Sequence, residues 1–383
     1  MKKLLPVFII ISILLSACGM FDSSYVVESD YALPAGKEND TGDSLSVSNL
    51  SELREAVRII VAQGGESNSI LFESNYNGTP TEDLAAAIWQ VRTEDALCAY
   101  CVENISYELA QIVSYTEAKI TVTYSPRALS VEEITSMPYA TPLNETLSDA
   151  LSQGKERIAV LINRSTISAE DMQTRVSDVY RRHPGLAPRE PETTVTMFSG
   201  SGTQRLYEII LSSGLSTEEF TERKEKMDAI ELPVEEDAGE FERALAAADY
   251  LLDCYDPEAA DTVYDALIVG KASPEGVALA YVELCRRLNL DCRIVYGQKD
   301  WQDYCWNIVR VDGNYYHADL CVSPDKGFLK SDSSFWGSYR WTTSAYPKCS
   351  EEAHFEDAEE QPEEQTEEQK EEPPEELLEG PVI

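Results

Sequence analysis

Residues 270–281 read Gly-Lys-Ala-Ser-Pro-Glu-Gly-Val-Ala-Leu-Ala-Tyr, and this stretch predicts where a buried helix begins. Serine is favoured at a helix N-cap and proline at the first helical position, the places that Ser273 and Pro274 take. Apolar residues then recur at helical spacing on one face, at Val277, Ala280, Tyr281, Leu284 and Leu288. We therefore expect a helix with one face buried in a core.

Two stretches downstream complete a pattern with this helix. Residues 303–309 read Asp-Tyr-Cys-Trp-Asn-Ile-Val, and residues 312–319 read Asp-Gly-Asn-Tyr-Tyr-His-Ala-Asp. With the helix, they resemble the bacterial transglutaminase-like domains, which belong to the papain-like cysteine-enzyme fold. The resemblance runs from about Glu240 to Cys349 and implies a transglutaminase-core domain over residues 235–349.

Members of that family carry the nucleophile in a Gly-Lys-Ala-Val-Cys-x-Gly-Tyr-Ala motif at a helix N-terminus, where the helix and a neighbouring imidazole stabilise the thiolate. The imidazole comes from a His-Ala-Trp-Asn strand, and a carboxylate in a Tyr-His-x-Asp strand orients it. In this chain Pro274 stands at the cysteine position and Tyr304 at the histidine position, and only Asp319 remains. Loss of any triad member costs orders of magnitude in rate, so the resemblance implies a degenerate, inactive triad.

Three neighbouring residues are the possible substitutes. Ser273 is expected to be held as a cap by backbone amides, with no base in reach. Cys305 follows Tyr304, so strand alternation is expected to point it to the opposite face. His317 matches a noncatalytic histidine and shares a strand face with Asp319, which favours a hydrogen-bonded structural pair. An enzyme that uses another residue set, a divergent cysteine-type or serine-type peptidase or transglutaminase at the cell envelope, stays open as the alternative.

Aromatic residues are concentrated in this part of the chain: Trp301, Tyr304, Trp306, Tyr315, Tyr316, Phe335, Trp336, Tyr339, Trp341 and Tyr346. Trp306 and Tyr316 are the candidates for the core. The candidates for a ligand cleft are Ser273, Trp301, Trp306 and His317. Aromatic rings in a groove suit a sugar ring or a peptide.

The N-terminal residues have the pattern of a secretory signal. Lys2 and Lys3 precede an apolar run from Leu4 to Leu15, which is well short of the roughly 20 residues that span a bilayer as a helix. The sequence Leu15-Ser-Ala-Cys18 resembles the bacterial lipobox, whose cysteine carries the lipid after cleavage. We therefore expect a bacterial lipoprotein that is held outside the cytoplasm, at the cell membrane, by a lipid on Cys18.

The net charge of the chain limits the kinds of partner that it can bind. Lys+Arg number 31 and Asp+Glu number 69, which gives a net charge of −38. Such a surface does not suit nucleic acid, and it is repelled by an anionic bilayer, so membrane attachment needs the anchor.

Eight cysteines besides Cys18 permit disulfides outside the cytoplasm, and Cys321 to Cys349 is one candidate pair. Nothing in the sequence indicates a cofactor or a metal site. We expect Cys98 and Cys101 to form a local disulfide or to be two buried thiols.

Upstream of the transglutaminase-like stretch, two segments repeat one order of elements. Helix, strand, helix and two strands are predicted in each, with helices near Leu50–Ala62 and Leu143–Ser152 opening the two copies. The predicted α+β chain therefore has two tandem αβαββ modules before a papain-like/transglutaminase-core domain. Its predicted divisions are a signal peptide (1–18), a flexible tether (19–47), modules 48–135 and 140–230, the core domain (235–349) and a disordered acidic tail (350–383).

The sequence thus favours a lipid-anchored extracytoplasmic protein whose transglutaminase-like domain is inert. Its expected role is to bind or scaffold a protein, a peptide or a cell-wall ligand.

Overall fold

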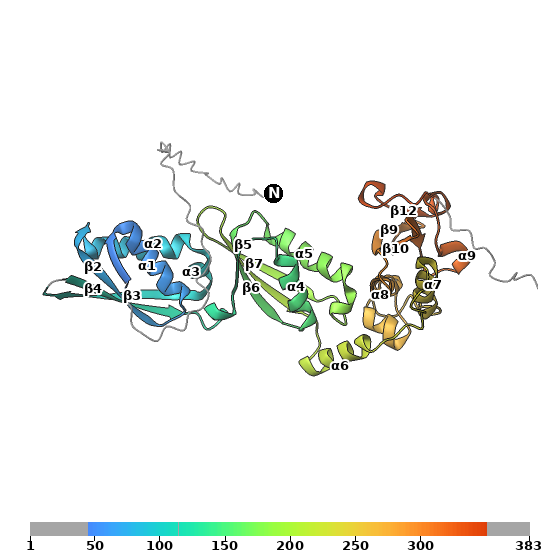
Figure 1. The fold of residues 1–383 in the computed structure, drawn as a ribbon, viewed down its shortest axis with the longest axis horizontal. Coiled ribbons are helices and arrows are strands. Elements are labelled where there is room, and N and C mark those ends of the chain that lie inside the picture. Colours follow the sequence, from blue (N-terminus) through green and yellow to red (C-terminus); the bar gives the residue numbers. More distant parts are fainter. Residues whose placement is uncertain (1–44, 114, 351–383) are drawn as a thin grey trace, which may run out of the picture. The chain divides into compact units, whose positions relative to one another are not determined.

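The computed structural model describes residues 45–113 and 115–350 as a mixed α+β fold (Figure 1). The signal peptide with Cys18, nearly all of the tether and all but the first residue of the acidic tail lie outside the described residues. The chain divides into two compact units. One comprises the residues up to Ala140 with Val160–Ser165 and Ser199–Arg205, and the other comprises the remainder.

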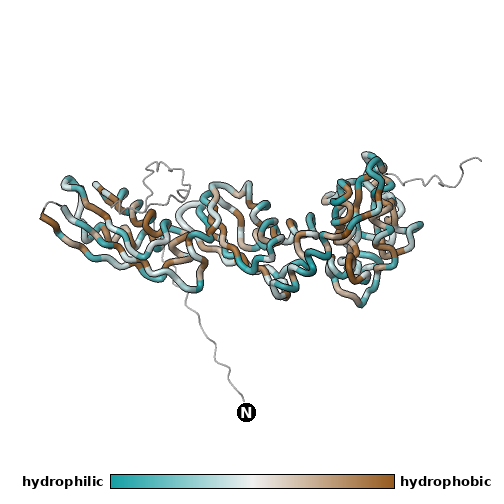
Figure 2. Tube along the Cα trace, turned by 60° about the horizontal axis from the view of Figure 1, so that its bottom comes forward, coloured by the Kyte–Doolittle hydropathy of each residue, from teal (hydrophilic) through white to brown (hydrophobic). Residues whose placement is uncertain are grey.

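The first sheet has the strand order β1-β2-β4-β3, with β1 parallel to β2 and the other neighbours antiparallel. Its strands are β1 (Leu45–Asn49), β2 (Ser67–Asn77), β3 (Val102–Ile112) and β4 (Tyr115–Tyr124). The helices of this region are α1 (Leu50–Ala62), α2 (Pro80–Glu94) and α3 (Ala96–Cys101). Buried and exposed residues alternate along β4, where Ala118, Ile120 and Val122 are buried, and this alternation shows as changing hydropathy along the strands in Figure 2.

The second sheet has the order β5-β6-β8-β7, the same as the first, and its first two strands are again parallel. Its strands are β5 (Thr135–Tyr139), β6 (Arg157–Arg164), β7 (Glu192–Ser199) and β8 (Arg205–Ser212). The helical elements that follow β5 and β6 are α4 (Leu143–Ser152), α5 (Ala169–Arg182) and the 3-10 turn η2 (Pro184–Leu186). The turn η1 (Val131–Glu133) lies before β5.

The predicted order of elements omitted the strand that opens each sheet. α1 and α4 have the predicted bounds, but β1 and β5 precede them, so the order is βαβαββ rather than αβαββ. Each missed strand has five residues. Five residues give little periodicity to separate a strand from a loop, so the sequence alone does not reveal them.

The third sheet, with order β11-β10-β9-β12, follows the helices α6 (Thr217–Asp228) and α7 (Glu240–Tyr250). Its strands are antiparallel: β9 (Cys292–Lys299), β10 (Gln302–Val311), β11 (Asn314–Ala318) and β12 (Tyr339–Arg340). The other elements are the π-helical turn η3 (Asp265–Val269), α8 (Pro274–Arg287), the short α9 (Pro324–Gly327) and α10 (Asp332–Phe335), and η4 (Thr343–Ala345).

Helix α8 begins as the sequence predicts. Ser273 is its N-cap and accepts a hydrogen bond from the Gly276 amide at 3.4 Å, and Pro274 is its first residue. Residues 276–285 are all buried. A side chain at position 276 would meet the Ala272 Cβ at 2.7 Å and the Thr262 carbonyl oxygen at 3.0 Å, so glycine permits this close approach.

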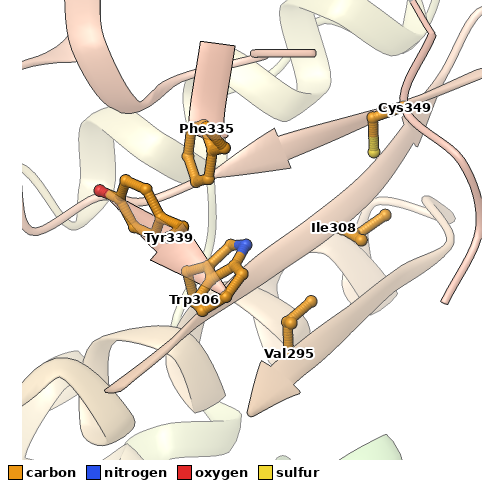
Figure 3. Packing of buried hydrophobic residues seen from close by; sticks show 6 residues of the cluster. All are labelled: Val295, Trp306, Ile308, Phe335, Tyr339 and Cys349. Carbon is orange, nitrogen blue, oxygen red and sulfur yellow. The ribbon is translucent and has the colours of Figure 1, made fainter. Parts of the chain in front are cut away.

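An aromatic core lies on the sheet that α8 packs against. Figure 3 shows the Trp306 indole between Val295, Ile308, Phe335 and Tyr339, with the Cys349 thiol at the edge of the cluster. Trp306 is 1% exposed, and Tyr316 is 7% exposed. The assignment of both residues to the core is confirmed.

Candidate functional site

A cavity of about 610 Å³ opens at the N-terminus of α8. It is lined by residues from the loop before α8, from the first turn of that helix, and from β9 and β10: Asp261, Ser273, Pro274, Glu275, Tyr296, Gly297, Gln298, Asp303, Tyr304 and Cys305. Pro274 and Tyr304, which were predicted to replace a nucleophile and a base, therefore line one cavity. Its volume lies within the range of small-ligand sites, about 300–1,000 Å³.

Asp319 lies beside this cavity as a saturated hydrogen-bond acceptor. Its carboxylate is 1% exposed and accepts from the Tyr304 hydroxyl at 3.0 Å and the Lys299 ammonium at 2.9 Å. The Tyr339 hydroxyl donates to it at 2.6 Å and the Cys321 amide at 2.9 Å. Four donors, one of them cationic, engage both oxygens of this carboxylate, so Asp319 is fully used as a hydrogen-bond acceptor.

The phenol of Tyr304 cannot replace an imidazole base. Burial, together with the neighbouring Asp319 charge, raises the pKa of the Tyr304 hydroxyl well above its ordinary value. The group therefore stays protonated at neutral pH and acts as a hydrogen-bond donor. The Lys299 ammonium lies 4.7 Å from the centre of the Tyr304 ring, which is a cation–π distance. This contact and the hydrogen bond to Asp319 together hold the ring in place.

His317 is fully buried in the aromatic core and not in the cavity. The Trp306 indole N–H donates to its Nδ1 at 2.9 Å, and its Nε2 lies 3.0 Å from the Asp332 Oδ1. An indole nitrogen can only donate, so Nδ1 is the acceptor and the ring proton sits on Nε2. Burial lowers the pKa of His317 and keeps this tautomer neutral.

The expected pairing of His317 with Asp319 is wrong. Strand β11 ends at Ala318, so the alternation that would have placed the two side chains on one face does not extend to Asp319. Asp319 turns to Tyr304 and Lys299, and His317 takes Asp332 from α10.

His317, Asp332 and Cys349 form a cluster whose ligand atoms all lie within 4.8 Å of one another. A metal would need the lone pair of Nε2, but that nitrogen carries the proton. The other tautomer would set a proton on Nδ1 against the Trp306 N–H. This cluster therefore does not fit a metal ion.

The same cluster does not form a cysteine–histidine dyad. Burial, and then the Asp332 charge, raises the pKa of the Cys349 thiol to about 12, and both nitrogens of His317 are engaged. A thiol at this position stays protonated at neutral pH and has no base to take its proton.

Cys305 is among the residues that line the cavity, together with Tyr304. The two residues are neighbours on β10, where alternation places their side chains on opposite faces, as the sequence predicts. Burial raises the pKa of the Cys305 thiol well above its usual range. His183 and His317 are the two histidines of the described part of the chain, and neither lines the cavity.

The four candidate cleft residues are separated by the structure. Ser273 lines the cavity and is 6% exposed, whereas Trp306 and His317 are buried in the core at 1% and 0%. Trp301 is 73% exposed at the turn between β9 and β10, where Arg340 stacks on its ring at 3.4 Å. Trp306 and His317 are therefore not cleft residues, because each packs its ring among other aromatic side chains.

Sequence reasoning missed the acidic lining of the cavity. Asp261, Glu275 and Asp303 come from three separate segments, and in a chain with 69 acidic residues none of them stands out. The one signal was position: Glu275 directly follows Pro274, the residue predicted to stand at a nucleophile position at the start of α8.

The eight described cysteines are free thiols. Cys321 and Cys349 are both free, so the candidate pair between them is not formed in this structure. Cys98 and Cys101 are buried in the single turn of α3, which agrees with the expectation of buried thiols.

No family model and no curated protein matches this chain. One solved structure with some likeness is described as the crystal structure of a TGase, a transglutaminase, at a TM-score of 0.20 and 11% sequence identity. The matched region covers 56% of this chain and 63% of the length of the transglutaminase chain. A TM-score this low does not establish a common fold. Among the described residues, no helix is both long and apolar enough to cross a membrane.

Proposed function

We propose that this chain is a lipid-anchored extracytoplasmic protein whose transglutaminase-like domain binds a ligand without catalysis. The observation that carries the proposal is the cavity at the N-terminus of α8, which Pro274 and Tyr304 both line. In the family that the sequence resembles, these are the positions of the nucleophile and its base. The surviving acid, Asp319, is held by Tyr304 and Lys299 in a structural network.

The chemistry of the cavity supports binding rather than turnover. Its two conventional nucleophiles are Ser273 and Cys305, and no histidine accompanies either in the lining. The Ser273 oxygen caps α8, and the Cys305 thiol has a raised pKa because it is buried. Without an imidazole, the base most often used, a capping serine and a protonated thiol are weak nucleophiles at neutral pH.

The remaining regions fit a display role in this proposal. We propose that residues 48–135 and 140–230 are two copies of one α/β module, supported by their shared strand order and their parallel first strand pairs. A lipid on Cys18 and the tether at 19–47 would hold these modules and the core domain, 235–349, outside the cytoplasm, ahead of a solvated acidic tail.

The test blocks the cavity with a tryptophan side chain at Asp303, an exposed residue of its lining. The full chains of the wild type, Asp303→Trp and Gln302→Trp are immobilised and incubated with a synthetic pool of random-sequence hexapeptides, and in parallel with soluble peptidoglycan fragments. Asp303 lines the cavity and Gln302, its exposed neighbour on β10, does not. We expect wild type and Gln302→Trp to retain the same components, measured by mass spectrometry, and Asp303→Trp to retain about tenfold less.

Equal retention by all three proteins would reject the cavity as the binding site. A fluorophosphonate and an iodoacetamide probe are applied to the same proteins. Labelling of Ser273 or Cys305 together with release of cleaved or cross-linked peptide would favour the enzyme alternative instead.

A further inference from the structure

The charge of the cavity lining identifies a class of ligand, and this inference rests on the proposed function. We propose that the cavity takes a cationic group, an ammonium or a guanidinium, carried on a peptide. Three carboxylates line it, those of Asp261, Glu275 and Asp303, and no lysine or arginine is among the lining residues. A cationic side chain in this place would meet only negative formal charge.

The nearest cations are neutralised by other partners. Arg181 lies over the Tyr296 ring at 4.7 Å, and its charge is balanced by Glu190 at 3.3 Å. Lys299 is bound to Asp319 at 2.9 Å. Arg181 also offsets part of the charge of Glu275, but it is shared with Glu190, so the three carboxylates leave the lining net negative. A cavity wall of low dielectric concentrates the resulting field.

Hydrogen-bonding capacity in the lining is also incompletely used. Ser273 is 6% exposed, and its hydroxyl oxygen accepts one long hydrogen bond, of 3.4 Å, from the Gly276 amide. Among the described residues none accepts the hydrogen of this hydroxyl, and Ser273 is one of the residues that line the cavity. A buried donor of this kind favours a ligand that also carries an acceptor, as a peptide carbonyl does beside a cationic side chain.

Glu275 should couple binding to pH. Burial raises the pKa of this carboxyl, while its Oε1 accepts from the Tyr296 hydroxyl at 2.9 Å. The charged groups that act on it are Arg181 from α5, Asp261 from the loop before α8 and Glu190 from the segment before β7. A cation in the cavity favours the ionised form, so binding releases a proton and strengthens as the pH rises through the pKa of Glu275.

The experiment uses the full chain and a matched pair of ligands. A fluorescein-labelled octapeptide of alternating lysine and alanine is compared with the same peptide acetylated on every lysine, by anisotropy in about 150 mM salt, where long-range attraction to the acidic chain is screened. Glu275→Gln with Asp303→Asn removes two charges from the lining. Asp249→Asn with Glu258→Gln removes two charges from exposed positions outside it.

We expect the lysine peptide to bind about tenfold more weakly to the cavity double variant and within about twofold of wild type to the control double variant. Affinity of the wild type should increase from pH 5 to pH 7, and Glu275→Gln should reduce this dependence. An arginine peptide should bind as the lysine peptide does.

Three outcomes would overturn the inference. Equal weakening by both double variants would show attraction to overall charge. Equal binding of the acetylated peptide, abolished by Asp303→Trp, would show a cavity for neutral ligands, in which case the proposed function stands and this inference falls. Spermidine that binds as tightly as the peptide would show that a free polyamine, not a peptide, is the ligand.

Discussion

Asp319 has a phenol, and not an imidazole, as its hydrogen-bond partner from β10. In a catalytic triad, a carboxylate orients an imidazole, whose two nitrogens can pass a proton on. Here the carboxylate holds a phenol with a raised pKa, a second phenol from Tyr339 and the Lys299 ammonium. These three groups all donate hydrogen bonds to Asp319, so at the scale of single residues this carboxylate holds three side chains in place.

The proposed correspondence of positions 274 and 304 to a nucleophile and a base can be tested by placing a thiol and an imidazole there. In the double variant Pro274→Cys with Tyr304→His, an imidazole replaces the phenol that contacts Asp319, and the new thiol stands at the N-terminus of α8, where the helix dipole favours a thiolate. We expect the variant to be alkylated at position 274 by iodoacetamide at pH 6, at least about tenfold faster than the single variant Pro274→Cys.

The single variant is the matched control because it holds the same thiol without the imidazole. Circular dichroism and the melting temperature show whether each variant folds. A folded double variant whose thiol reacts no faster than that of the single variant would mean that positions 274 and 304 are not a nucleophile–base pair.

At the scale of elements, helix α8 carries two glutamates with opposite electrostatic surroundings. Glu283 is fully buried and is paired with Arg286 and Arg287, each at 2.7 Å, and it accepts from the Gly185 amide at 3.1 Å. Burial alone would raise the pKa of Glu283, but the two arginines hold it below its ordinary value. Burial raises the pKa of Glu275, near the start of the same helix.

Opposite shifts predict opposite effects of glutamine at pH 7. A carboxyl whose pKa is lowered by folding stabilises the protein above its unfolded pKa, and this contribution is lost as the pH falls through the folded pKa. Glu283→Gln should therefore lower the free energy of unfolding by about 3 kcal/mol at pH 7, since it breaks a buried ion pair. The difference from wild type should shrink in acid.

Glu275→Gln is the matched control on the same helix. A carboxyl whose pKa is raised by folding contributes its stability below the unfolded pKa and loses it as the pH rises through the folded pKa. Its replacement should leave the free energy of unfolding unchanged or increased at pH 7. Urea denaturation between pH 3 and pH 8 measures both variants; the same sign for the two at pH 7 would contradict the assignment.

The elements also show what the sequence could and could not predict. The N-cap of α8, its buried face and the bounds of α1 and α4 follow from local signals, which act within a few residues. The carboxylates of the cavity and the tautomer of His317 depend on contacts between segments far apart in the chain. The place of Cys305 in the cavity lining could not be predicted, because alternation gives the face of a strand but not the extent of a cavity beside it.

At the scale of the whole molecule, a net charge of −38 sets a requirement for attachment. A chain this acidic is repelled by the anionic lipids of a membrane surface, so it does not stay there through its folded surface. Under the function proposed above, the lipid on Cys18 would be the attachment. A single lipid chain gives only marginal binding, and multiple chains give stable anchoring, which is expected of a lipoprotein cysteine.

Replacing this one sulfur should therefore change the location of the entire protein. In bacterial cells that express the full chain and are fed an alkyne fatty acid, we expect the wild type to incorporate the label and to sediment with membranes, and Cys18→Ser to incorporate none. Cys292→Ser, which removes a partly buried thiol of the folded region, should label as the wild type does. Label retained by Cys18→Ser would place the lipid elsewhere. Loss of label with unchanged sedimentation would mean that the uncleaved apolar run Leu4–Leu15 or a partner, and not the lipid, holds this acidic chain at the membrane.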